Sequence, residues 1–128
     1  MLSRDTGVQA VAGFVGGTLA VLSAQFGPAA AGTPLLLGAA SYAVVFAGAH
    51  VYLALRGDGE TVPVAARWRF VALVLTAVGA MVVGVTFREV SVAGTGLGTV
   101  LGFGVVALFL GYWVYEAWDG YQAGRRGA

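Results

Sequence analysis

The chain of 128 residues contains no cysteine and no lysine, and only 10% of its residues are charged. Without cysteine it can form no disulfide, and it offers no thiolate to zinc or to an iron–sulfur cluster. A soluble domain typically carries about 25% charged residues, so the low charge argues against a surface that faces water on all sides. The net charge of +1 also excludes the strongly basic surface that nucleic acid requires. The composition therefore predicts a membrane protein without a nucleic-acid partner.

Apolar residues make up 59% of the chain and are gathered into four long runs. About 20 apolar residues in a helix are needed to cross the roughly 30 Å of hydrocarbon in a bilayer. The runs predict four transmembrane helices at about 8–26, 35–55, 68–87 and 94–118. We expect a single all-α integral membrane domain over residues 1–128, with the lipid bilayer as its main environment. The length of the first run favours a permanent helix, although Ala29–Ala31 leave a cleaved signal peptide as the alternative.

The arginines predict the orientation of the four helices. With a cytoplasmic N-terminus, only Arg88 lies outside, and the others lie inside: Arg4, Arg56, Arg67, Arg69, Arg125 and Arg126. Short cytoplasmic connections are enriched in basic residues, so both termini are expected inside. Amphipathic aromatic rings gather at membrane–water interfaces. The same inner face would hold the interface anchors, which are Tyr52, Trp68, Tyr112, Trp113, Tyr115 and Trp118.

Two sets of glycines are spaced four residues apart, which places each set on one face of a helix. Gly13 and Gly17 form a pair in the first run, and Gly94, Gly98 and Gly102 form a ladder at the start of the last. Small residues let two helices approach closely in lipid, where packing has to drive association. We expect both glycine sets to be helix-packing faces, in the manner of a glycine zipper.

Only one titratable side chain lies clear of the helix ends, and it is His50. Glu116 is expected at a similar depth, so the two could form a buried pair in which each neutralises the other. Ionisable groups inside a membrane often mark a proton relay or a ligand site, and the alternative is a histidine satisfied by its neighbours near the headgroups. Hydroxyls such as Thr18, Ser41 and Thr76 can bond to their own helix carbonyls and predict no site. No residue pattern indicates a catalytic centre or a metal site.

Two resemblances extend this reading. The stretch from His50 to Arg56 resembles the haem-binding segment of succinate dehydrogenase membrane anchors, which implies His50 as a candidate haem ligand. A b-type haem takes two axial ligands, so one histidine per chain would serve only across a subunit interface. In size, four spans, absent lysine and richness in glycine and alanine, the whole chain resembles small four-span membrane proteins of halophilic archaea and of their pleomorphic, membrane-enveloped viruses. The viral resemblance implies a non-enzymatic protein of the lipid envelope.

Taken together, the sequence predicts a small non-enzymatic scaffold or accessory subunit without a cofactor, placed in a cell membrane or a viral envelope. It would pack laterally against copies of itself, as a homo-oligomer, or against a larger membrane protein. An oligomeric transporter or channel is the alternative, and a haem-bearing anchor subunit that uses His50 is the third.

Overall fold

The computed structural model describes residues 3–25, 33–59 and 62–127, and it is helical almost throughout. The helices are α1 (Arg4–Gln25), α2 (Thr33–Leu55), α3 (Val64–Thr86) and α4 (Leu97–Gly127), and the short strands β1 (Ser91–Val92) and β2 (Thr95–Gly96) lie between α3 and α4. Each of the four helices is long and apolar enough to cross a membrane. The all-helical architecture with four candidate spans, typical of a multi-pass membrane protein, is thereby confirmed. The connection between the first two predicted helices lies almost wholly outside the described residues.

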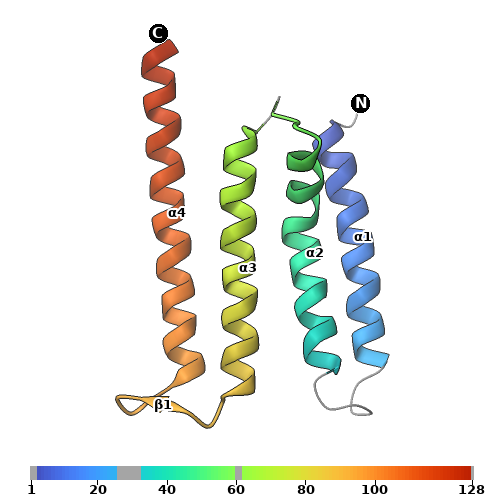
Figure 1. Cartoon of the computed structure of the whole chain (residues 1–128), viewed down its shortest axis with the longest axis vertical. Coiled ribbons are helices and arrows are strands. Elements are labelled where there is room, and N and C mark those ends of the chain that lie inside the picture. Colours follow the sequence, from blue (N-terminus) through green and yellow to red (C-terminus); the bar gives the residue numbers. More distant parts are fainter. Residues whose placement is uncertain (1–2, 26–32, 60–61, 128) are drawn as a thin grey trace.

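The four helices stand in an open row in the order of the sequence (Figure 1). Within the described residues, extensive helix–helix packing joins only neighbours in the chain: α1 with α2, α2 with α3, and α3 with α4. We call the end of the row at which α1 begins, α2 ends, α3 begins and α4 ends the termini end. Here α4 projects well beyond its neighbours (Figure 1). The row leaves α1 and α4 as its two edges, each with one packed side.

The predicted bounds were wrong at several helix ends. The helices α1 and α3 begin at Arg4 and Val64, before the apolar runs do, because backbone hydrogen bonds can extend a helix beyond its apolar residues. Both ends of the predicted helix 94–118 were wrong, because α4 begins at Leu97 and continues to Gly127. Ala93 and Gly94 have positive φ angles of 51° and 82°, and they form the turn between β1 and β2. A two-residue turn with both central residues at positive φ is the type I′ hairpin turn, so Gly94 lies in a turn and not on a helical face.

The tightest packing in the row involves glycines that the four-residue spacing does not single out. A Cβ added at Gly16 would clash with Val45 and lie 3.1 Å from the carbonyl oxygen of Ser41, so α1 and α2 touch backbone to backbone there. A Cβ added at Gly84 would lie 3.3 Å from the Cα of Gly98. The ladder residue Gly98 therefore packs inside the chain, against α3.

The remaining predicted packing glycines have no close neighbour in the chain. A Cβ added at Gly13, Gly17 or Gly102 would meet nothing within 4 Å. Alanine supplies most of the buried apolar residues, as at Ala47 and Ala49 on α2, while α4 has no buried residue. Small side chains let the axes of α1, α2 and α3 approach, and α4 is attached mainly by its contacts with α3.

Candidate functional site

The most buried charged side chain of the described residues is Arg67, which is 1% exposed. It lies in the first turns of α3, at the termini end. Its Nη2 donates to both carboxylate oxygens of Asp5 on α1, at 3.3 and 3.1 Å, and its Nε donates to the carbonyl oxygen of Asp58 at 3.0 Å. A buried guanidinium is tolerated only when it is paired and hydrogen-bonded, so these contacts are what allow Arg67 to lie among three helices.

The chain after α2 is shaped to bring Asp58 to this place. Gly57 has a φ of 67°, its N–H donates to the carbonyl of Ala54, and the N–H of Asp58 donates to the carbonyl of Leu53. These two bonds form a Schellman motif, in which a residue at positive φ closes a helix and satisfies its last carbonyls. The turn places the backbone carbonyl of Asp58 next to Arg67. The side-chain carboxylate of Asp58 pairs with Arg4 at 3.3 Å. The helices α1, α2 and α3 are thus tied together at one end.

His50 lies one turn inside this network, on α2. Its ring contacts Phe70 of α3 at a centroid distance of 4.6 Å, and Phe70 in turn contacts Tyr112 of α4 at 6.1 Å. The Nδ1 atom of His50 is buried and has no hydrogen-bond partner among the described residues. An unpartnered buried nitrogen is unfavourable, because the group has lost its bond to water. His50 is therefore the polar side chain of this region whose bonding is incomplete.

The expected pair of His50 and Glu116 does not form. Glu116 accepts from Arg69 of α3, from Nε at 2.7 Å and from Nη2 at 3.2 Å. The planar guanidinium matches a carboxylate in this two-bond arrangement. Because α4 packs mainly on α3 while His50 belongs to α2, the arginine on the intervening helix reaches Glu116. Asp119 adds a second carboxylate to Arg69 at 3.6 Å, so this cluster ties α4 to the row.

A polar groove of about 520 Å³ opens between α1 and α3, over α2. Its polar lining comes from Asp5, Thr6 and Gln9 of α1, His50 of α2 and Arg67 of α3. Gln9 is exposed, and its Nε2 donates to the carbonyl of Val45 on α2 at 2.9 Å. The volume falls within the roughly 300–1,000 Å³ that small-molecule sites occupy. We take this polar groove as the candidate functional site.

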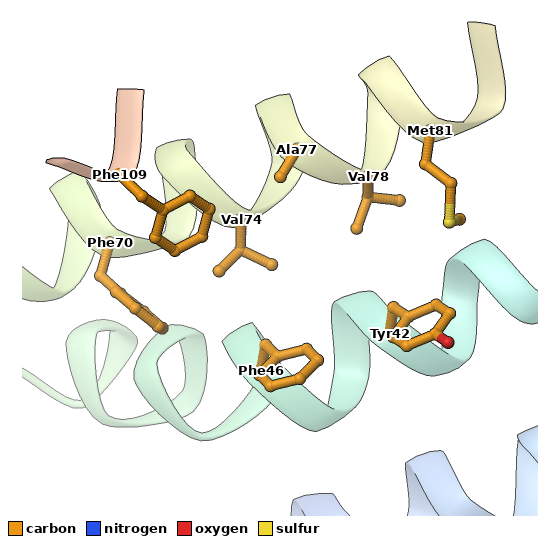
Figure 2. Close-up of a pocket in the computed structure, with 8 residues that line it drawn as sticks. All are labelled: Tyr42, Phe46, Phe70, Val74, Ala77, Val78, Met81 and Phe109. Carbon is orange, nitrogen blue, oxygen red and sulfur yellow. The ribbon is translucent and has the colours of Figure 1, made fainter. Parts of the chain in front are cut away.

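A second groove, of about 260 Å³, is almost wholly apolar (Figure 2). It lies between α2 and α4, over α3, and its lining residues are Tyr42, Phe46, Phe70, Val74, Ala77, Val78, Met81 and Phe109. The rings of Tyr42 and Phe46 stack in parallel with centroids 6.3 Å apart. Beyond the hydroxyl of Tyr42, these side chains offer only hydrocarbon, aromatic rings and the thioether of Met81. The groove suits a hydrocarbon chain and carries no chemistry of its own.

The predicted interface anchors lie at the termini end, in the parts of the helices where they were expected. Tyr52, Trp68, Trp113, Tyr115 and Trp118 are exposed, and Tyr112 is half-buried. The arginines of this end use some of these rings. Arg56 donates to the hydroxyl of Tyr52 at 3.0 Å, and the guanidinium of Arg69 lies 5.2 Å from the ring centre of Tyr115. Aromatic rings gathered at this end of the row fit the role of interface anchors, which remains a prediction.

The hydroxyls inside the helices bond locally, as expected. Thr18 donates to the carbonyl of Phe14, Ser41 to that of Leu37 and Thr76 to that of Ala72. They need no ligand to explain them. Within the described ranges, no three His, Cys, Asp or Glu side chains gather so that they could hold a metal ion.

Sequence reasoning missed the contacts of Asp5, Arg67 and Arg69, and it used the two arginines only as topology signals. The available indication of pairing was that acidic and basic side chains occur at the same end of the helices. Comparison of the chain with protein-family models, with curated proteins and with solved structures finds no match.

Proposed function

We propose that this protein is a non-enzymatic membrane subunit that works by lateral assembly, with copies of itself through the free side of α1. The observation that carries the proposal is the position of Gly13 and Gly17. Both lie on α1 at one edge of the row, and a Cβ added at either would meet nothing within 4 Å. The adjacent Gly16 packs against α2. The helix therefore has one small-residue face that is packed and a second that is not.

The open row supports this proposal. A closed bundle covers each helix on two sides, whereas α1 and α4 here are packed mainly against one neighbour. In lipid, close approach over small residues is a main source of helix association. A second α1 edge placed against Gly13 and Gly17 would gain that contact without rearranging the chain.

Substitution at Gly17 tests the assembly. We expect Gly17→Leu to leave the melting temperature of the protomer unchanged in detergent and to weaken self-association in bilayers by about 5–30-fold, as for 1–2 kcal/mol. Energy transfer between donor-labelled and acceptor-labelled copies measures that association. Gly79→Leu is the matched control, because Gly79 lies on α3 in the middle of the row and also has open space around it. Equal association of the parent and Gly17→Leu would refute the α1 contact.

The orientation is part of the proposal, with both termini in the cytoplasm. Six of the seven arginines lie on the elements of the termini end, and Arg88 lies after α3 at the other end. Single cysteines at Gly59 and Ser91 test this in the cysteine-free chain. An impermeant thiol reagent applied to intact cells should label Gly59→Cys poorly and Ser91→Cys well. The reverse pattern would invert the topology.

The resemblance in layout to four-span membrane proteins of halophilic archaea and their enveloped viruses extends the proposal to a structural protein of such a membrane. The open row suits a protein that covers membrane area through repeated lateral contacts. Genes for a spike protein beside this gene, and the chain itself in purified virions, would support the envelope role. A dehydrogenase or transporter gene in that place would favour the accessory-subunit form.

A further inference from the structure

The polar groove contains hydrogen-bonding groups that the chain itself does not satisfy. The Nδ1 atom of His50 has no partner among the described residues. Gln9 uses its Nε2 on the carbonyl of Val45, which leaves its side-chain oxygen as an acceptor. The carboxylate of Asp5 has about four acceptor positions, and among the described residues it receives bonds from Nη2 of Arg67 alone. The hydrogen-bonding positions left unused in the groove are therefore mainly acceptors. A ligand would have to donate hydrogen bonds to them.

The charges around the groove are already paired. Arg67 bonds to Asp5, and Arg4 pairs with Asp58. These two pairs sum to zero with His50 neutral, so a bound ion would bring a charge without a counter-ion. Transfer of an unpaired charge from water to a partly buried site is strongly unfavourable. The charge balance therefore selects an uncharged ligand over a cation or an anion.

From these observations we infer that the polar groove binds an uncharged molecule through hydroxyl groups. A hydroxyl donates to the free acceptors and also accepts, so it suits an imidazole in either tautomer. The groove lies at the helix ends, and in a protein that spans a bilayer with these helices such ends meet the lipid headgroups and water. Two sources share this chemistry: the polyol or sugar headgroup of a neutral lipid, and a free polyol from solution. The site does not depend on lateral assembly, because its lining comes from α1, α2 and α3 of one chain.

The single histidine of the chain provides the assay. The protein, labelled with ¹³C and ¹⁵N in histidine, is placed in phosphatidylcholine nanodiscs, and the His50 ring resonances are followed by NMR. One arm adds glycerol, and the other replaces part of the lipid with a monogalactosyl diacylglycerol. Protonated ethanolamine is the charged comparison. We expect a saturable shift of the His50 resonances in at least one polyol arm, and the responding arm identifies the source.

Two matched variants separate binding in the groove from a general solvent effect. Ala10 lines the groove on α1, so Ala10→Leu should fill it and weaken the response at least tenfold. Ala20→Leu, at an exposed position farther along α1, should respond as the parent does. If Ala10→Leu does not fold, Gln9→Leu is used instead, because it removes the amide that lines the groove on α1. A response without saturation, a response that survives these changes, or a shift with ethanolamine alone would overturn the inference.

Discussion

Adjacent glycines in α1 should respond in opposite ways to the same substitution. The Cβ of an alanine at position 16 would meet Val45 and lie 3.1 Å from both the Val45 backbone nitrogen and the Ser41 carbonyl oxygen. These are backbone atoms of α2, which cannot move aside as a side chain can. At Gly17 the same Cβ would enter open space. The two positions are adjacent on the same helix, and Gly16 is buried against α2 while Gly17 is exposed, so the contact with α2 is what distinguishes them.

Two effects determine how much each substitution changes the free energy of unfolding. Replacement of glycine by alanine inside a helix stabilises the folded state by about 0.5–1 kcal/mol, and this applies at both positions. Overpacking costs about 1–3 kcal/mol and applies at Gly16 alone. We therefore expect Gly17→Ala to raise the free energy of unfolding slightly and Gly16→Ala to lower it. The difference between the two variants, in which the helix term cancels, should be about 1–3 kcal/mol.

Unfolding by SDS in mixed micelles, followed by circular dichroism, measures this difference for the monomer. Gly13→Ala serves as a second control, because its Cβ would also meet nothing within 4 Å. A Gly16→Ala variant as stable as Gly17→Ala, or more stable than it, would contradict this prediction. Either result would mean that α1 and α2 do not touch backbone to backbone at Gly16.

Three further predictions concern the hairpin, the α3–α4 cluster and His50. Ala93→Asn should raise the free energy of unfolding by about 0.5–1 kcal/mol, because alanine at positive φ is strained and asparagine tolerates it; a lower melting temperature would contradict the turn. Glu116→Gln should lower stability by about 1 kcal/mol through loss of the ion pair across α3 and α4. The fully solvated Glu89, treated in the same way, should show no change. His50→Gln should keep the parent's melting temperature, and a visible absorbance band that this change removes would instead favour the haem-anchor alternative.

The sequence by itself was sufficient for the secondary structure class and for the number of helices. Four apolar runs of about 20 residues leave few alternatives, since a backbone in lipid has to satisfy its hydrogen bonds within each helix. The order of arginines and apolar runs along the chain also predicted that most arginines lie at one end of the row. Helix ends were less certain, because the apolar pattern marks the hydrocarbon boundary and a helix does not stop there. Gly94 shows this, since its spacing from Gly98 suits a helix while its φ of 82° belongs to a turn.

Only the tertiary structure decided which polar groups meet. His50 and Glu116 were expected at a similar depth, and depth was all that the sequence could give. Whether they touch depends on which helices are neighbours, and in an open row α3 separates α2 from α4. Arg69 on α3 therefore forms the ion pair with Glu116 on α4. Arg67 on α3 forms an ion pair with Asp5 on α1, across the end of α2. Helix order and rotation follow from packing over small residues such as Gly16 and Gly84. The spacing of glycines on one helix does not reveal which helix they contact, because close contact depends on the residues of both helices.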